Sequence, residues 1–281
     1  MRLDGISQRY RRTGPWVLRD VDLELPPPGR LVRATGGNGG GKSTLLRLVA
    51  GVCEPTRGKV HERPAHRGYV PERFPAALPF TAHDYLCHLG RIHGLRGAEP
   101  ARRAGAVLER FGAAAFAHTP LVQLSKGTCQ KVAVAQALLA DPELLVLDEA
   151  WTGLDQQARA ALDQAVAERL ADGGIVLYVD HDPTRLAELP SVRWMVGDGR
   201  VRERNTAESR PALRLTFSGR GTGGGAAAGL AQLPGVLDVL DLAGPAATGA
   251  GRIRLTVEAD HSDELLRLLL ADPDVHIEAV Q

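Results

Sequence analysis

A glycine-rich stretch between residues 36 and 43 decides which fold this chain can adopt. It reads Gly36-Gly37-Asn38-Gly39-Gly40-Gly41-Lys42-Ser43. A short apolar run at 31–34 precedes it, and the apolar spacing from residue 43 onward is that of a helix. Glycines let a loop curl so that its N–H groups converge on phosphate oxygens at the positive end of a helix. The pattern G-x-x-x-x-G-K-S between a strand and a helix therefore predicts a phosphate-binding loop.

The residues of this loop have distinct predicted tasks. Lys42 is expected to reach the β- and γ-phosphates of a nucleotide, and the Ser43 hydroxyl is expected to bind Mg²⁺. The predicted nucleotide-binding residues of the loop are Gly36, Gly37, Asn38, Gly39, Gly40, Gly41, Lys42, Ser43 and Thr44.

A second part of a nucleotide site follows much later in the chain. Residues 144–149 read Leu-Leu-Val-Leu-Asp-Glu, an apolar run that ends in two carboxylates. Consecutive apolar residues are typical of a strand buried on both faces of a parallel sheet. Asp148, at the carboxyl end of that strand, is expected to hold Mg²⁺ directly or through water. Glu149 lies one residue further and faces differently, so it could polarise an attacking water as a general base.

The order of apolar runs predicts the architecture of residues 1–203. Strand-like runs alternate with helical patterns, which indicates an α/β core with a mainly parallel sheet. Residues 1–25 alternate apolar and polar residues, as strands joined by a turn do. Most of 74–140 has helical spacing. The expected core strands lie at 31–34, 144–147, 175–179 and 192–196, and a further helix at 156–171.

The composition changes after residue 203. Residues 204–211 are polar and are expected to form a linker. The wider Arg-rich stretch 200–210 also contains Glu203 and Glu208, so it is interpreted as a solvated segment.

Residues 212–281 regain a regular pattern. Apolar and polar residues alternate at 213–217 and 253–257, as in half-buried strands. Ser262 or Asp263 could cap the second of two helices. The order β-α-β-β-α-β indicates a small α+β, ferredoxin-like module. Further strands are expected at 236–242 and 275–280, and helices at 226–233 and 262–270.

Composition excludes several classes of protein. The 281 residues carry a net charge of +1, which does not favour a polybasic nucleic-acid binder. Three widely spaced cysteines argue against a disulfide framework and fit a reducing compartment. No apolar run is long enough to span a membrane, and the N-terminus lacks a signal-peptide core, so a cytosolic chain is expected. His83 and Cys87 have no third and fourth ligand at suitable spacing, so no metal site beyond Mg²⁺ is expected.

With four further elements, residues 1–203 resemble the ATP-binding subunit of ABC transporters. Residues 124–131, Leu-Ser-Lys-Gly-Thr-Cys-Gln-Lys, look like the signature sequence of that family. Residues 152–155, Thr-Gly-Leu-Asp, are similar to the loop after its catalytic glutamate. His181 follows a predicted buried strand, and Tyr10 stands where the family has an aromatic that stacks on adenine. The resemblance implies a P-loop fold of ABC type, with a parallel core sheet, an antiparallel β subdomain and a helical subdomain at 74–140.

The resemblance also implies a mechanism. Two copies would close head to tail, with each ATP between the phosphate loop of one copy and the signature of the other. His181 would contact the γ-phosphate and act with Lys42 and Glu149, and Asp155 would carry information across the dimer seam. The signature residues expected at the nucleotide are Ser125, Lys126, Gly127 and Thr128.

Several positions depart from the family pattern. Glu72 stands where a glutamine is usual, and its carboxylate can still bind Mg²⁺. Lys126 replaces the usual second glycine, Thr128 a glutamine, and Asp180 a small hydroxyl residue. Lys126 could add a positive charge near the phosphate of the other copy or be a solvated lysine at a helix start. Glu72 together with Leu-Ser-Lys-Gly resembles the subfamily that pairs with ABC-2-type export permeases.

The expected function is therefore ATP hydrolysis that powers a separate integral-membrane permease. Export of a drug, antibiotic, ion or similar small molecule is the leading expectation, with the chain on the inner face of the cell membrane through its permease. One alternative is a soluble ABC-type ATPase of a non-transport machine. Another is an importer ATPase whose C-terminal module is a sensor rather than a dimer-stabilising appendage.

Overall fold

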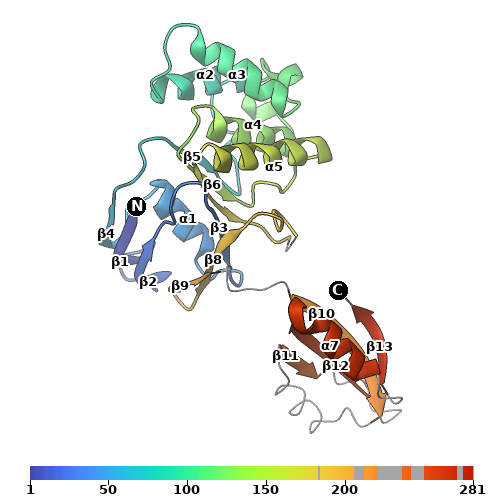
Figure 1. Ribbon diagram of the computed structural model, residues 1–281. Coiled ribbons are helices and arrows are strands. Elements are labelled where there is room, and N and C mark those ends of the chain that lie inside the picture. The colour runs from blue at the N-terminus through green and yellow to red at the C-terminus, as the bar shows by residue number, and fades with distance from the viewer. Residues whose placement is uncertain (183, 206–211, 221–235, 242–249, 271–274, 281) are drawn as a thin grey trace. The chain divides into compact units, whose positions relative to one another are not determined.

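The chain folds into two units, each with its own hydrophobic core (Figure 1). The first unit is Met1–Thr206 and the second is Ala207–Gln281. The computed structural model describes residues 1–182, 184–205, 212–220, 236–241, 250–270 and 275–280.

A six-stranded sheet forms the centre of the first unit. Its strand order is β5-β6-β7-β3-β8-β9, and all neighbours are parallel except the pair of β8 and β9. This confirms the predicted mainly parallel α/β core. The strands are β3 (Leu31–Thr35), β5 (Arg67–Val70), β6 (Leu144–Asp148), β7 (Ile175–Val179), β8 (Ser191–Gly197) and β9 (Arg200–Asn205).

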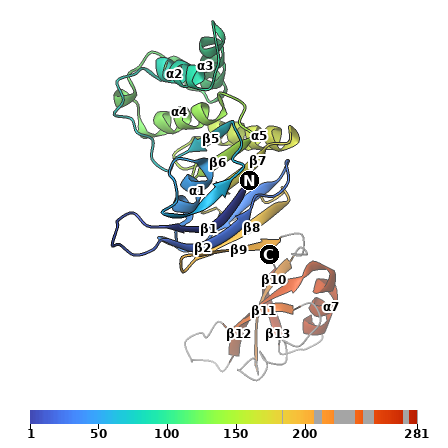
Figure 2. The ribbon, with the colours of Figure 1, turned by 90° about the vertical axis from the view of Figure 1, so that its left-hand side faces the viewer.

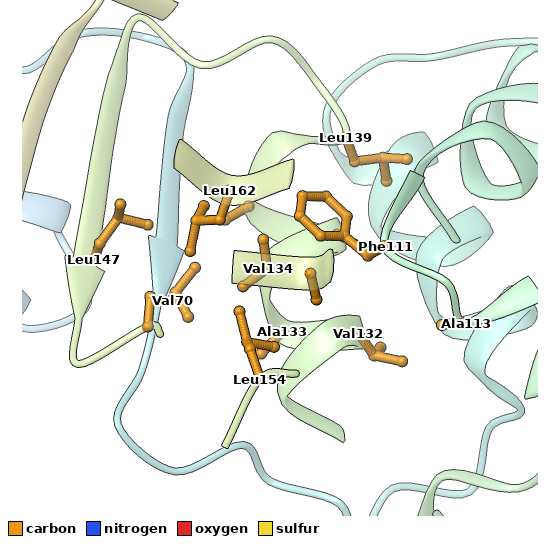
Figure 3. Close-up of a cluster of buried hydrophobic side chains, with 14 of the residues drawn as sticks. Val70, Phe111, Ala113, Val132, Ala133, Val134, Leu139, Leu147, Leu154 and Leu162 are labelled. Carbon is orange, nitrogen blue, oxygen red and sulfur yellow. The ribbon is translucent and has the colours of Figure 1, made fainter. Parts of the chain in front are cut away.

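Side chains of β6 alternate between two cores on opposite faces of this sheet. Leu145 and Leu147 pack into one cluster, and Leu144 and Val146 into the other. All five residues of the strand are buried. Figure 3 shows the first cluster, where Leu147 lies near Val70 and Leu162. The unbroken apolar run in the sequence thus reflects a strand that is covered on both faces.

The other face of the sheet is covered by α1 (Lys42–Ala50) and by a small antiparallel sheet. The small sheet has the order β2-β1-β4. Leu45 and Leu48 of α1 pack with Leu3 and Trp194 in one buried cluster. Figure 2 shows β1 and β2 beside β8 and β9. The small sheet consists of β1 (Arg2–Gln8), β2 (Leu18–Glu24) and β4 (Arg57–His61).

Helices α2–α4 form the predicted helical part, at one end of the first unit (Figure 1). Thr81 caps α2 by accepting a hydrogen bond from the Asp84 N–H. Phe111 and Val134 lie in the cluster shown in Figure 3 and join this part to the core sheet. The segments are α2 (Ala82–Ile92), α3 (Glu99–Arg110), 3₁₀ turns at Ala114–Phe116 and Leu121–Gln123, and α4 (Lys126–Leu138); α5 (Gln156–Ala171) follows β6.

The interpretation of 200–210 as a solvated linker is wrong for its first part. Residues 200–205 form β9, which pairs antiparallel with β8 at the edge of the core sheet. Val201 is half-buried, and Arg202 and Glu203 are exposed, as charged residues on an edge strand commonly are. The strand ends at Asn205, two residues inside the range predicted as linker, and the rest of that range lies outside the described residues.

The second unit contains an antiparallel sheet with α7 (Ala259–Leu270) packed on it. Its strand order is β11-β12-β10-β13. Ser262 and Asp263 do not cap α7, because the helix begins three residues before Ser262. The helix predicted at 226–233 lies outside the described residues, so the β-α-β-β-α-β order stays a prediction. The strands are β10 (Ala212–Arg220), β11 (Val236–Asp241), β12 (Ala250–Glu258) and β13 (Val275–Val280).

None of the helices in the described ranges combines the length and apolar character that a membrane span requires.

Candidate active site

The glycine-rich loop connects the end of β3 to the start of α1. Gly36 has φ 150°, and a Cβ there would lie 1.9 Å from the carbonyl oxygen of Val196. Gly41 has φ 100° and stands at the N-cap of α1. Both positions therefore require glycine, because a side chain would strain the backbone or collide with β8.

The first turn of α1 presents backbone N–H groups at the loop. The first four N–H groups of a helix have no partner within it. Gly41 has no side chain to cap them, and no acidic residue lies in the first turn. These donors, together with the helix dipole, favour an anion at this end of α1.

Lys42 lies across the loop. Its Nζ donates hydrogen bonds to the carbonyl oxygens of Gly36 at 2.9 Å and Gly37 at 3.0 Å. The ammonium group is therefore held over the glycines, beside the N-terminus of α1. A phosphate group bound there would meet both a fixed cation and the helix N–H groups.

Asp148 and Ser43 meet at the carboxyl end of β6. Asp148 is 1% exposed, and its Oδ1 accepts a hydrogen bond from the Ser43 hydroxyl at 3.1 Å. The Tyr69 hydroxyl lies 3.4 Å from Oδ2. Burial raises the pKa of Asp148, and the charges of Glu72 and Glu149 add to this effect. The buried carboxylate and the neutral hydroxyls beside it are hard oxygen donors, which are the ligands that Mg²⁺ prefers.

Glu149 and His181 come together from the ends of two neighbouring strands. Glu149 follows β6 with φ 53°, and its N–H donates to the Val179 carbonyl oxygen on β7. His181 follows β7, and its Nε2 lies 2.8 Å from Glu149 Oε1. The left-handed backbone turns the Glu149 side chain away from the direction of the strand, toward the loop that carries His181.

Tyr10 lies beside the phosphate loop, and its aromatic ring is exposed to solvent. Its side chain is 60% exposed, and its hydroxyl lies 2.7 Å from Thr44 Oγ1. Arg47 donates to the same hydroxyl at 3.2 Å. Two polar contacts thus anchor the far end of the ring, which leaves an exposed aromatic surface next to the loop.

Glu72 lies in the segment after β5, half exposed. Its carboxylate is 3.9 Å from Arg73 Nε, and its charge acts on Asp148. The departure from glutamine therefore places a third carboxylate in the electrostatic neighbourhood of Asp148 and Glu149.

The signature residues form the start of α4. Ser125 is the N-cap, and its Oγ accepts a hydrogen bond from the Thr128 N–H at 3.2 Å. Lys126 is exposed. A Cβ at Gly127 would lie 3.0 Å from the Gly153 carbonyl oxygen, so α4 begins close to the loop after β6. Among the described residues, no hydrogen bond or ion pair joins this segment to the phosphate loop.

Asp155 caps α5 and is paired with α4. Its Oδ1 accepts from the Ala158 N–H at 2.9 Å, and its Oδ2 lies 2.6 Å from Lys131 Nζ. The hydrogen bond from Lys131 lowers the pKa of Asp155. The loop between Glu149 and Asp155 is therefore tied to the signature helix of the same copy.

His83 and Cys87 are adjacent on α2. His83 Nε2 lies 3.6 Å from the Cys87 Sγ. Within the described part of the chain, no group of three or more His, Cys, Asp or Glu side chains is placed to hold a metal ion.

Three polar residues near the site were not found from the sequence. Tyr69 contacts Asp148, Arg47 contacts Tyr10, and Arg33 of β3 contacts the loop that carries His181. Burial, together with the charge of Asp148, raises the pKa of Tyr69 to about 12. No motif marks these residues, because their roles depend on contacts between segments far apart in the chain.

Comparison with known proteins gives matches over the first unit and beyond it. The ABC transporter family model matches residues 18–152. The zinc import ATP-binding protein ZnuC of Cereibacter sphaeroides is 41% identical over 180 residues, which are 61% of this chain and 69% of that protein. ZnuC of Halorhodospira halophila is 33% identical over 248 residues, which are 85% of this chain and 89% of that protein.

Solved structures of ATP-binding subunits have the same fold. The ATP-binding subunit of an ABC transporter has a TM-score of 0.65 and 29% identity, over 74% of this chain and 91% of that one. The dimeric ATP-binding cassette MJ0796, in a post-hydrolysis state with ADP and phosphate, has a TM-score of 0.62 and 26% identity, over 73% and 97%. The sequence and fold matches together show that this chain belongs to the ATP-binding proteins of ABC transporters and is an ATPase that uses ATP with Mg²⁺.

Proposed function

We propose that this chain is the ATP-hydrolysing subunit of an exporter whose membrane-spanning permease is a separate protein. The observation that carries the proposal is the meeting of Glu149 and His181 at 2.8 Å, beside the hydrogen bond from Ser43 to the buried Asp148. These groups come from the ends of two neighbouring strands, β6 and β7, and from the start of α1 next to the phosphate loop.

The phosphate loop binds the triphosphate. Lys42 exchanges its contacts with the Gly36 and Gly37 carbonyls for phosphate oxygens, and the N–H groups at the start of α1 bind the same anion. Tyr10 offers its exposed ring to the adenine base. Ser43, Asp148 and Glu72 would hold Mg²⁺, which when bound neutralises charge on the phosphates.

Glu149 is the general base for hydrolysis. It takes one proton from a water molecule while the water oxygen bonds to the γ-phosphorus and the bond to the ADP oxygen breaks. His181 holds the Glu149 carboxylate through the 2.8 Å contact and faces the γ-phosphate. The products are ADP and inorganic phosphate.

The signature segment of a second copy completes this site. Ser125 and the N–H groups at the start of α4 form an anion-binding helix end, as the start of α1 does. Lys126 is exposed at that end and adds a positive charge. Each ATP is then enclosed by the phosphate loop of one copy and the signature of the other, and ATP binding drives closure of the pair.

The Glu149→Gln variant tests the proposed chemistry. Loss of the base abolishes steady-state turnover, while ATP still binds and holds two copies together. Turnover would be measured by phosphate release, and association by light scattering with and without ATP. Glu143→Gln, at an exposed carboxylate just before β6, is the matched control. Wild-type turnover in Glu149→Gln would overturn the assignment.

Export is the proposed direction, because Glu72 and the Leu-Ser-Lys-Gly signature resemble the subfamily of ABC-2-type exporters. Purification of the tagged Glu149→Gln chain in mild detergent should recover the permease. When bound to the permease, the chain is expected on the inner face of the membrane. Vesicles that contain both proteins, with ATP supplied on the side of this chain, should move substrate away from that side. Recovery of no membrane protein, together with stimulation of turnover by RNA or DNA, would instead indicate a non-transport machine.

Zinc import is the second candidate function, because the relatives reported above are named zinc import ATP-binding proteins. The same vesicles distinguish it from export. If Zn²⁺ moves toward the side of this chain when ATP is hydrolysed, the chain powers an importer.

A further inference from the structure

A buried arginine on β3 needs an explanation. Arg33 is 9% exposed and lies in the strand that leads into the phosphate loop, three residues before Gly36. Burying a charged group is costly unless hydrogen bonds or opposite charges compensate it. Its neighbours Val32 and Ala34 in β3 are apolar, so local packing does not require a cation here.

The Arg33 guanidinium holds the backbone on both sides of His181. Its Nη2 donates to the carbonyl oxygen of Asp182 at 2.8 Å and lies 3.4 Å from that of Asp180. The guanidinium carbon also lies 5.6 Å from the centre of the Tyr178 ring. One side chain of β3 therefore bridges the carbonyl groups of the two residues on either side of the histidine.

A second arginine holds the acidic side chains of the same loop. Arg185 is mostly buried, and its Nη2 lies 3.4 Å from Asp182 Oδ2 while its Nε lies 3.8 Å from Asp180 Oδ2. The Asp182 N–H donates to Asp180 Oδ1 at 2.7 Å. Asp180, where the family usually has a small hydroxyl residue, is thus part of a network of charges that fixes the loop.

We infer that Arg33 is a positioning residue for ATP hydrolysis, which keeps the His181 imidazole against Glu149 by fixing the loop backbone. It also links that loop to the strand that carries the phosphate loop, so the two sides of the γ-phosphate site share one anchor. The inference rests on the proposed roles of His181 and Glu149. A displacement of about 1 Å in such a group can lower a rate by about two orders of magnitude.

Arg33→Met and Arg33→Lys test this role. In Arg33→Met, kcat should fall roughly 10- to 100-fold while KM and the Kd for ATP stay within about threefold of wild type. Arg33→Lys, which keeps the charge and one donor group, should recover part of the loss. The control is Arg193→Met, at the residue that pairs with Arg33 on the neighbouring strand β8; in the described part of the chain it makes no hydrogen bond to residues 180–182.

Amide hydrogen exchange gives a readout that does not depend on activity. Exchange at residues 180–182 should accelerate in Arg33→Met and not in Arg193→Met, with the melting temperature reported for each variant. The inference is overturned if loop exchange is unchanged, if kcat is that of wild type, or if kcat, ATP affinity and Tm fall together in both Arg33 variants. The His181→Ala variant separates the proposed role of His181 from the inferred role of Arg33. Wild-type turnover in His181→Ala would overturn the proposed role of His181, whatever the exchange measurement shows for Arg33.

Discussion

The phosphate side and the signature side of the site differ in how complete they are within one chain. On the phosphate side, Lys42 is already bonded to the loop carbonyls, Ser43 is bonded to Asp148, and Glu149 meets His181. On the signature side, the only hydrogen-bond partner of the Ser125 hydroxyl within the described residues is Thr128 of its own helix. Under the proposed function, this difference means that one copy binds the nucleotide by itself, whereas hydrolysis needs the signature of a second copy.

The largest effect is expected on the phosphate side, in Lys42→Ala. The ATP Kd should rise by about two orders of magnitude, because the variant loses a charge-assisted bond to phosphate that the loop holds in place. Turnover should be lost with it. ATP binding would be measured by calorimetry, and Lys59→Ala, at an exposed lysine on β4, should bind as wild type does.

Asp148→Asn should separate stability from activity on the same side. Burial raises the pKa of Asp148, so its ionised form is disfavoured in the folded chain and opposes folding more as the pH rises above the usual aspartate range. The amide removes this charge, and the Tm without nucleotide at pH 8 should rise. Mg²⁺-dependent turnover should fall by about 100-fold. A lower Tm would contradict this account of the buried carboxylate.

On the signature side, Ser125→Asp should lower turnover without weakening ATP binding. Aspartate is as good an N-cap as serine, so α4 should keep its stability. Its negative charge repels the triphosphate of the other copy, and turnover should drop by about 100-fold. Calorimetry on the single chain should give the wild-type Kd. A weaker Kd would mean that the signature contributes to binding in its own copy.

The smallest effect is expected from removal of residues 207–281. The first unit has its own cores and all the proposed site residues, so turnover at high protein concentration should change less than about threefold. If the second unit stabilises the dimer, half-maximal turnover should need more protein. A candidate ligand whose effect on turnover disappears with the deletion would instead identify the unit as a sensor.

The sequence predicted the features that local patterns encode, but not those that depend on contacts between distant segments. The strand 144–148 and the loop 36–43 were found because burial on both faces and the need for glycine leave direct traces in the sequence. β9 was missed, since an edge strand rich in arginine has the composition of a linker. The contacts of Arg33 with residues 180 and 182 join strands distant in the chain, and no local pattern encodes them.

The start of α7 shows a different limit. Ser262 is a good capping residue, but the helix begins at Ala259, and Ser262 is buried within it. Capping preference is worth only about 1 kcal/mol, and packing of Leu265 and Leu269 into the second core can outweigh it. Ranges of helices are therefore better predicted than their first residues.

Mixing two inactive variants tests whether two copies share each site. Lys42→Ala damages only the phosphate side, and Ser125→Asp only the signature side. In a mixed head-to-tail pair, one site combines both defects and the other has none. Random pairing of equal amounts should thus restore roughly a quarter of wild-type turnover. Turnover in the mixture that stays at the level of the separate variants would contradict the shared site.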